Sequence, residues 1–254
     1  MEVFQTLTIF SVGFLGACLG SFAYVLSTRL HTGQHIARGR SKCASCARTL
    51  SFSDLIPIFS FLLLRGRCRT CGSVLNPMYF FVELFTALLF VIFLFAFGIT
   101  LALIPALLSG VFLVALLAYD IRHTVIPDVL VWSFTLLAFL TALLFTTSPS
   151  HLFATVIVAL GIAAALGAIW FLSKGRAIGL GDAKLALGLS LLVGYPASIS
   201  GIVLSFWVGA VVGLALLVLL PEKFQRKTEI PFAPFLIIGF LIPLAFGWNL
   251  PLGL

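Results

Sequence analysis

Charged side chains are scarce in this sequence. Only 9% of its 254 residues are Asp, Glu, Lys or Arg, whereas these residues make up about a quarter of an ordinary soluble domain. Hydrophobic residues account for 61% of the chain, and 26 residues are phenylalanine. This composition excludes an ordinary soluble globular protein and predicts an integral membrane protein.

Long uncharged stretches indicate how often the chain crosses the membrane. They lie at residues 3–28, 84–119, 129–173, 185–221 and 230–254. Because about 20 helical residues span a bilayer, the first and last stretches predict one span each, and the other three predict two each. The two-span stretches should turn near Gly98, Ser148-Pro149-Ser150 and Gly194-Tyr195-Pro196. The sequence therefore predicts an all-α polytopic membrane protein with about eight transmembrane helices.

The distribution of basic residues gives an orientation. All 15 lysines and arginines fall in four loops, which lie on one side of the membrane if the chain turns as above. The positive-inside rule identifies that side as cytoplasmic, so both termini should face outward. Topology and contact with anionic membrane lipid account for the net charge of +7, and no nucleic acid is expected as a partner. The first span lacks a basic n-region and is interpreted as retained rather than as a signal peptide.

Four of the five cysteines form two Cys-x-x-Cys pairs in the first cytoplasmic loop, residues 29–78. Cys43 and Cys46 are separated from Cys68 and Cys71 by 21 residues, a spacing that suits a tetrathiolate zinc site. Two disulfides are the alternative, but such bonds rarely persist in a reducing cytoplasm. A segment of this size has little core of its own, so a structural zinc ion would stabilise it. No internal repeat is evident in the sequence.

Only eight residues are acidic, and four of these lie at predicted cytoplasmic ends of spans, where ionisable groups suggest function. Asp128 follows Pro127 at a helix start, so we expect it to cap that helix. Asp120 lies at a helix C-terminus, where the helix dipole disfavours an anion; an ion pair with Arg122 or a surface position is its alternative explanation. Glu83 could support the zinc loop or line a cavity.

The fourth carboxylate, Asp182, belongs to the tetrapeptide Gly-Leu-Gly-Asp at 179–182. The apolar run from Leu185 to the Gly194 turn gives only about 15 Å of helix, half the hydrocarbon thickness. We therefore expect the tetrapeptide to dip below the membrane surface as non-helical backbone beside a wet cavity. Gly179 and Gly181 would there permit positive φ and close approach of a substrate backbone.

Asp120 and Asp182, at matching depth on separate helices, suggest one reaction class. A carboxylate pair can activate water and protonate a peptide carbonyl without a metal or a nucleophile. Which of the two holds the proton is left open. Two other functions remain as alternatives: a membrane thiol oxidoreductase using the cysteine pairs, and a metal transporter using Asp120, Asp182 and Glu83 as an ion path. The charge asymmetry argues against the first, and the absence of charges from the outer half of the membrane argues against the second.

The chain resembles the bacterial type IV prepilin peptidases, the leader peptidase and N-methyltransferase family, over nearly its whole length. The resemblance is carried by "GSFAYVLSTRL" at 20–30, "SDLIPIFSFLLLRGRCRTCG" at 53–72, "YFFVELFTALLF" at 79–90, "YDIRHTVIPD" at 119–128, "GLGDAKL" at 179–185, "IPFAPFL" at 230–236 and the two cysteine pairs. Ala44 and Ala233 depart from the family pattern, which usually has proline and glycine there.

This resemblance implies a GxGD-class membrane aspartyl protease with Asp120 and Asp182 as its catalytic pair. It would cleave the basic leader from type IV prepilins or pseudopilins at the cytoplasmic face of the bacterial inner membrane. Gly179, Gly181 and Glu83 are candidates for substrate binding. N-methylation of the new terminus with S-adenosylmethionine rests on the family alone, because the sequence has no Rossmann-type glycine loop. The expected division is a first transmembrane helix at 1–28, a zinc-binding domain at 29–78 and a seven-helix protease domain at 79–254.

Overall fold

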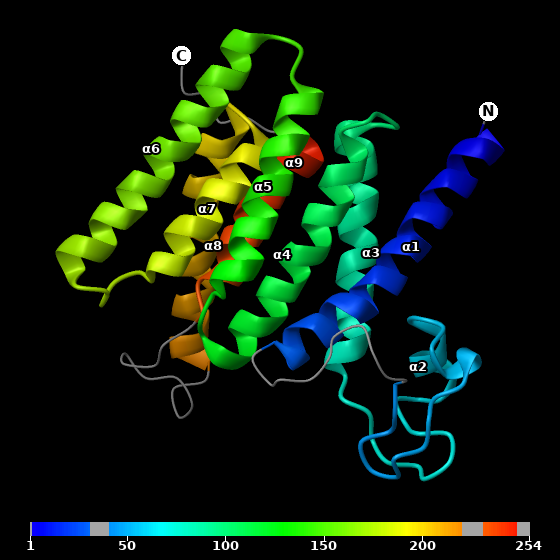
Figure 1. Cartoon of the computed structure of the whole chain (residues 1–254). Coiled ribbons are helices and arrows are strands. Elements are labelled where there is room, and N and C mark those ends of the chain that lie inside the picture. The colour runs from blue at the N-terminus through cyan, green and yellow to red at the C-terminus, as the bar shows by residue number, and fades with distance from the viewer. Residues whose placement is uncertain (1, 31–40, 220–230, 248–254) are drawn as a thin grey trace. The chain divides into compact units, whose positions relative to one another are not determined.

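The computed structural model describes residues 2–30, 41–219 and 231–247. Within these ranges the chain folds into helices only, joined by short turns and one longer loop that holds the four cysteines (Figure 1). The elements are α1 (Glu2–Arg29), η1 (Phe52–Asp54), α2 (Phe59–Leu63), α3 (Met78–Phe97), α4 (Leu103–His123), α5 (Asp128–Phe145), α6 (Pro149–Ser173), α7 (Leu180–Val193), α8 (Ala197–Leu219) and α9 (Ala233–Phe246).

The expectation of an all-α membrane protein is confirmed. Among the described residues, six helices are long and apolar enough to cross a membrane, namely α1, α3, α4, α5, α6 and α8. Of the two remaining helices that the sequence predicts as spans, α9 is a shorter apolar helix and α7 carries Asp182 and Lys184, and each has only 14 residues, or about 21 Å of length. The part of the last basic loop that carries Lys223, Arg226 and Lys227 falls outside the described residues.

The three expected turns occur where the sequence placed them. α3 ends one residue before Gly98, whose φ is +63°. α6 begins at Pro149 with Ser148 as its N-cap, where the fixed φ of proline suits a first helical position. α7 is followed by Gly194 with a φ of +79°. Glycine ends a helix readily because it adopts such angles without strain.

The chain divides into two compact units, Met1–Leu94 and Phe95–Leu254. The expected division at residues 28 and 78 stays a prediction. In the first unit, α1 and α3 pack through small residues. A Cβ atom added to Gly20 would lie 2.6 Å from Oγ1 of Thr86, and one on Gly16 would lie 2.8 Å from the Thr86 carbonyl oxygen. Close approach of this kind gives apolar helices dispersion contacts in lipid, where no hydrophobic effect drives them together.

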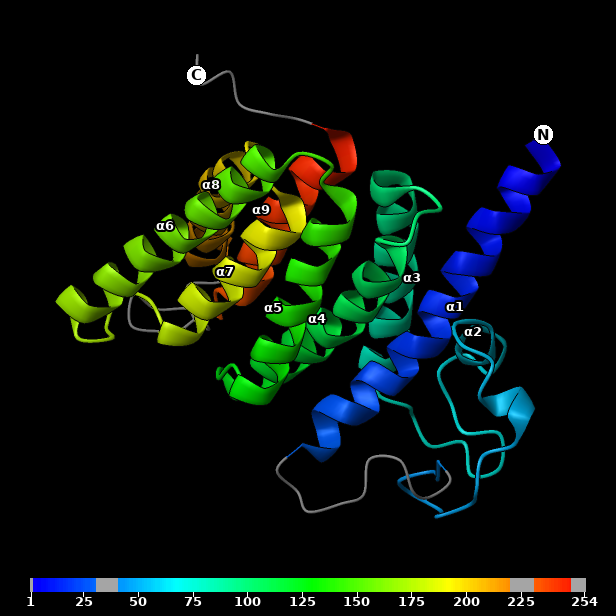
Figure 2. The same ribbon diagram turned by 45° about the horizontal axis from the view of Figure 1, so that its top comes forward.

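In the second unit, α7 packs against α5, α6, α8 and α9. Gly188 makes room for its neighbour, since a Cβ there would lie 2.5 Å from the ring of Phe134 on α5. The α4–α5 and α6–α7 connections lie at one end of this unit, and the α5–α6 connection lies at the other, in both views (Figures 1 and 2). The end of α4 and the start of α7 therefore share one end of the helix bundle.

Candidate active site and metal centre

Asp120 lies in the last turn of α4, which ends at His123. The residue is only 5% exposed, so the surface position considered from the sequence is wrong. Its carboxylate atom Oδ2 is buried and has no hydrogen-bond partner among the described residues. A buried carboxylate oxygen that no protein group satisfies is costly. It is therefore available to a water molecule or to a polar group of a ligand.

Asp182 lies in the first turn of α7 and is half-buried. Its Oδ2 accepts the backbone N–H of Gly179 at 3.2 Å, which satisfies one of the free N–H groups at the helix start. The expectation of non-helical backbone over 179–182 is wrong, because α7 already begins at Leu180. The three helical residues of the tetrapeptide lengthen α7, and only Gly179 is extended, at φ −75° and ψ 146°.

The two glycines of this tetrapeptide have different surroundings. Neither adopts a positive φ, so that part of the expectation is wrong. The close approach expected at Gly181 is confirmed: an added Cβ would lie 2.8 Å from Cβ of Ile126, in the connection between α4 and α5. At Gly179 an added Cβ would meet only Oδ2 of Asp182, at 3.3 Å, and the nitrogen of Gly181. Gly181 therefore lets the segment that follows Asp120 lie against the start of α7.

Three observations bring Asp120 and Asp182 to the same place. Asp120 and Asp182 lie near enough to each other for an electrostatic interaction between their carboxyl groups. Ile126, six residues after Asp120, fills the space beside Gly181. Finally, Nζ of Lys184 on α7 lies 2.5 Å from Oδ1 of Asp128 at the start of α5. The two carboxylates therefore lie on neighbouring segments at one end of the second unit.

Asp128 is the first residue of α5, as the sequence suggested, but its carboxylate forms the ion pair with Lys184. Its side chain is 66% exposed. In this part of the chain it is Asp182 whose carboxylate accepts an N–H at the start of its own helix. The sequence assigned the capping role to Asp128 because Pro127 precedes it, and it could not show that a lysine from α7 would reach this position.

Glu83 belongs to the first unit and lies in the second turn of α3. It is 8% exposed, and its Oε2 accepts the backbone N–H of Ile58 at 2.8 Å. The hydroxyl of Ser21 on α1 also donates to this carboxylate. Glu83 thus connects α1 and α3 to the cysteine loop, which agrees with the loop-supporting role considered from the sequence.

The four cysteines of the loop come together. Their sulfur atoms all lie within 4.8 Å of one another, and Sγ of Cys43 is 3.9 Å from Sγ of Cys71. A tetrahedral site with metal–sulfur distances of about 2.3 Å needs sulfurs about 3.8 Å apart. Cys43 and Cys68 are buried while Cys46 and Cys71 are exposed. This cluster could hold a metal ion.

The two cysteine pairs are built alike. In each, the N–H of the first cysteine donates to the carbonyl five residues later, from Cys43 to Arg48 at 2.9 Å and from Cys68 to Ser73 at 2.8 Å. The residue after the second cysteine turns back in the left-handed region: these residues are Ala47 at φ 55° and Gly72 at φ 67°. The expectation of no internal repeat is therefore wrong for the backbone, where a knuckle of six residues recurs after 25 residues.

Hydrogen bonds in the knuckles favour the thiolate form of Cys43 and Cys71. At Cys46 the N–H of Arg48 lowers the pKa, but contact with Cys43, burial and contact with Cys71 raise it to about 11. The backbone N–H of Cys46, followed by that of Ser45 and the hydroxyl of Ser73, lowers the pKa of the Cys43 thiol to about 6. The hydroxyl and backbone N–H of Ser73 also lower the pKa of Cys71. Since thiolates rather than thiols bind metals, these contacts suit the residues to a metal site.

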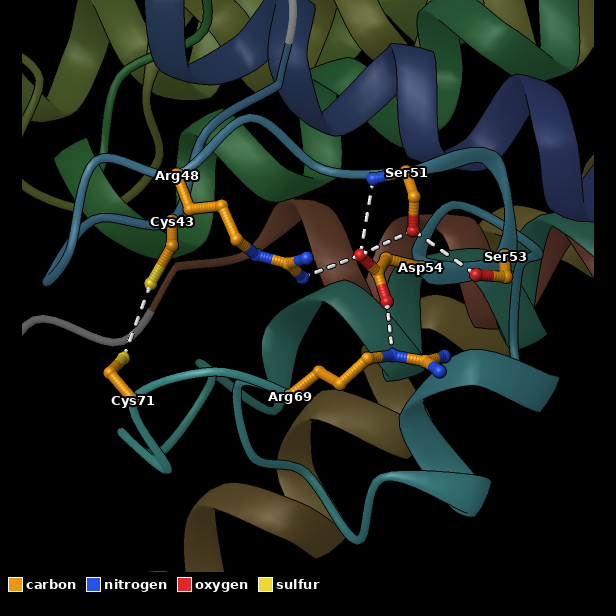
Figure 3. Close-up of polar contacts among 7 residues, drawn as sticks. All are labelled: Cys43, Arg48, Ser51, Ser53, Asp54, Arg69 and Cys71. Carbon is orange, nitrogen blue, oxygen red and sulfur yellow. Dashed lines mark hydrogen bonds and ion pairs between the residues drawn. The ribbon is translucent and has the colours of Figure 1, made fainter.

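Asp54 joins the two knuckles from outside the sulfur cluster (Figure 3). Its Oδ2 accepts the guanidinium of Arg48 at 2.6 Å, and its Oδ1 accepts Nε of Arg69 at 2.9 Å. Arg48 belongs to the first knuckle and Arg69 to the second. The hydroxyl and N–H of Ser51 complete the set at 2.7 and 3.1 Å. No role for Asp54 follows from the sequence alone, but its position between the two cysteine pairs is the signal that points to it.

Comparisons with known proteins agree with this geometry. A family model described as the bacterial peptidase A24 N-terminal domain matches residues 14–97, and one described as the type IV leader peptidase family matches residues 107–214. A prepilin leader peptidase/N-methyltransferase of Bacillus subtilis is 32% identical over 232 residues, covering 91% of this chain and 92% of the relative.

Proteins with the same name from other bacteria are similar over most of the chain. The Legionella pneumophila relative is 32% identical, covering 82% of this chain and 72% of its own length. The Pseudomonas aeruginosa relative is 32% identical, covering 82% of this chain and 71% of its own length. No solved structure matches the chain. The two family models and the coverage by these relatives lead to one conclusion: the chain belongs to the type IV leader peptidase family.

Proposed function

We propose that Asp120 and Asp182 are the catalytic pair of a membrane aspartyl endopeptidase that removes the leader from type IV prepilins or pseudopilins. The observation that supports this proposal is that Asp120 and Asp182 lie on neighbouring segments at one end of the second unit, with Oδ2 of Asp120 buried and without a partner among the described residues. Prepilins enter as substrates through the names of the relatives. The thiol oxidoreductase and the metal transporter lose support, since the family is a peptidase family.

The chemistry follows from one carboxylate being ionised and the other protonated. The ionised carboxylate removes a proton from water, and the water oxygen attacks the carbonyl carbon of the scissile peptide bond. The protonated carboxyl group donates its proton to the carbonyl oxygen. When the tetrahedral intermediate collapses, the C–N bond breaks and the departing amine takes up the proton that the base removed from water, while one hydroxyl of the intermediate returns its proton to the other carboxylate. The step consumes one water molecule and needs no metal ion.

The residues around Asp182 suit an extended peptide. Gly179 presents extended backbone directly before α7 and carries no side chain to block an approaching chain. Ile126 occupies the space beside Gly181, so the role of Gly181 is to let the start of α7 lie close to the segment that follows Asp120. We retain Glu83 as a candidate for lining the path of the substrate helix. The leader, which is basic, would reach the pair from the cytoplasmic side of the inner membrane, with both termini of the enzyme outside.

We assign zinc to the cluster of Cys43, Cys46, Cys68 and Cys71, in a structural role. All four ligands are thiolates and would fill the tetrahedral coordination of the ion, so no position remains for a substrate. Bound zinc would join the two knuckles and stabilise a loop with little apolar core.

N-methylation is a second activity, taken from the names of the relatives. Its methyl donor would be S-adenosylmethionine. The described residues contain no strand and thus no glycine loop of the Rossmann type. We therefore assign no residue and no step to methyl transfer.

The proposed function is tested with Asp120→Asn and Asp182→Asn in purified full-length protein, using a prepilin substrate. Loss of a general acid or base lowers turnover by about 10²–10⁴-fold, and we expect each variant to lose at least a hundredfold while keeping its thermal unfolding temperature and zinc content. Asp128→Asn is the matched control, because its carboxylate is exposed, and it should keep at least a tenth of the turnover. Full turnover in either Asp120→Asn or Asp182→Asn would remove that residue from the pair.

A further inference from the structure

The short helix α2 presents an apolar face that nothing in the described part of its unit covers. Phe59, Leu62 and Leu63 are 60%, 57% and 83% exposed. Their spacing of three and four residues places them on one side of the helix. Leaving three large apolar side chains together in water is unfavourable, and such a patch indicates a binding surface.

Contacts on the other side of α2 show where it lies along the membrane-spanning helix α3. The N–H of Ile58, which precedes α2, donates to Glu83 at 2.8 Å. Phe61 stacks on Phe80 of α3, with ring centroids 5.4 Å apart. Glu83 lies five residues after Met78, the first residue of α3, so the contact is about 7.5 Å along that helix. α2 therefore packs beside the first two turns of a membrane span.

Helix α1 of the same unit contacts the loop at the same level of α3. Tyr24 of α1 is 1% exposed, and its ring lies 4.3 Å from that of Tyr79 at the start of α3. Asn76 lies near the end of the loop that precedes α3, and its side-chain amide donates to the Tyr24 hydroxyl at 3.4 Å. The loop is thus fixed to both helices at the level where aromatic side chains with a polar end favour the membrane–water interface.

The charges next to α2 are complementary to an anionic lipid surface. Arg65 and Arg67 follow α2 directly and are exposed. Residues 41–77 contain five basic residues and one acidic residue, and that acidic residue, Asp54, is already paired with Arg48 and Arg69. Arginines at the edge of an apolar face can place their guanidinium groups at the level of lipid phosphates.

We infer that the exposed face of α2 lies in the lipid bilayer, with Phe59, Leu62 and Leu63 among the acyl chains and Arg65 and Arg67 on anionic headgroups. The cysteine loop is then a membrane-surface module rather than a water-exposed domain connected only by its ends. A basic prepilin leader is a poorer occupant, because the two arginines would repel it. A second copy of this chain would bring the same arginines against its own.

The inference is tested by photo-crosslinking in the full-length protein. The photo-reactive amino acid p-benzoylphenylalanine replaces Leu63 in one variant. In a second variant it replaces Phe59, whose side chain it closely resembles in shape. The matched control carries it in place of Val74, which directly follows the second knuckle and is 78% exposed. Each protein is placed in nanodiscs that hold one copy, made of phosphatidylcholine with or without phosphatidylglycerol. After irradiation, intact-protein mass spectrometry measures the lipid adduct.

We expect severalfold more lipid adduct at positions 63 and 59 than at position 74. The yield at 63 should rise when phosphatidylglycerol is present, and this rise should disappear in a variant that also carries Arg65→Gln and Arg67→Gln. Equal lipid adduct at 63, 59 and 74 would overturn the inference. The inference would also be overturned if the probe at position 63 formed adducts with added prepilin in place of lipid. Adducts between two copies of the protein in vesicles, in place of lipid, would overturn it as well. Zinc content, measured on each variant, establishes that the loop is folded.

Discussion

Nζ of Lys184 lies 2.5 Å from Oδ1 of Asp128, which joins the helix that carries Asp182 to the segment that follows Asp120. Lys184 is two residues beyond Asp182 on α7, and Asp128 begins α5, eight residues after Asp120. Together with the close approach of Ile126 to Gly181, this ion pair holds the segment that follows Asp120 against the start of α7.

The first prediction concerns this ion pair. Because Asp128 is mostly exposed, we expect Asp128→Asn and Lys184→Gln to change the free energy of unfolding by less than about 1 kcal/mol. Cleavage should fall severalfold in each, since small misplacements of reacting groups lower rates strongly. The measurement is kcat/KM in a double-mutant cycle. The double variant should lose no more than either single variant, and losses that simply multiply would show that the two side chains act separately.

The second prediction concerns the space beside Gly181. Its added Cβ would lie 2.8 Å from Cβ of Ile126, so Gly181→Ala must push the α4–α5 connection away from α7. We expect a destabilisation of about 1–3 kcal/mol and a loss of cleavage larger than the loss of stability alone would cause. Thermal unfolding and kcat measure the two effects.

The control for Gly181→Ala is Gly167→Ala. Gly167 lies inside α6, and an added Cβ there would meet no atom within 4 Å. Alanine should stabilise this helix by up to about 1 kcal/mol, because glycine is the poorer helix former. If Gly181→Ala were as harmless as Gly167→Ala, Ile126 would not determine the position of Asp182.

The third prediction concerns Asp54 and metal affinity. Asp54→Asn removes the charge that Arg48 and Arg69 share, so the two knuckles lose their connection outside the sulfur cluster. Loss of a supporting contact around a metal site typically costs about 10–100-fold in affinity, and we expect zinc to be lost to a competing chelator at correspondingly lower chelator concentration. Ser53→Ala is the control, since its hydroxyl contacts only Ser51 among the described residues. Equal zinc affinity in Asp54→Asn and Ser53→Ala would contradict the role given to Asp54.

Asp54 also has a defined pH dependence. The Ser51 hydroxyl and N–H, together with Arg69 and Arg48, hold the pKa of Asp54 well below its usual range. A carboxylate with a lowered folded-state pKa stabilises the fold fully above its unfolded pKa of about 3.9, and this contribution is lost as the pH falls further. The difference in unfolding free energy between wild type and Asp54→Asn, measured on zinc-free protein, should thus be constant from neutral pH to about pH 5 and shrink below about pH 4.

The fourth prediction separates two roles of Glu83. As the acceptor of the Ile58 N–H, it can be replaced by glutamine, whose amide oxygen also accepts. Glu83→Ala should release the loop and speed tryptic cleavage at Arg65, Arg67 and Arg69, while Glu83→Gln should leave cleavage near the wild-type rate. If Glu83 instead contacts the substrate through its charge, Glu83→Gln would raise KM for the prepilin with no change in proteolysis.

Much of this protein could be predicted from local sequence. The helices and their turns follow from apolar runs and from Gly98, Gly194 and Pro149, because lipid requires every backbone hydrogen bond to be made within the helix. The sulfur cluster follows from cysteine spacing. The helical start of α7 was missed because glycine normally argues against helix, whereas here the Asp182 carboxylate satisfies the N–H of Gly179.

The sequence by itself determined the membrane class and singled out the four cysteines and the two aspartates as candidates, since scarcity makes each charged or metal-binding residue conspicuous. Only the tertiary structure decided which groups those residues meet. Lys184 with Asp128, Ile126 with Gly181, and Asp54 between Arg48 and Arg69 are contacts between separate segments. Their partners depend on how helices and loops pack in three dimensions, and no periodicity or spacing along a single chain records that arrangement.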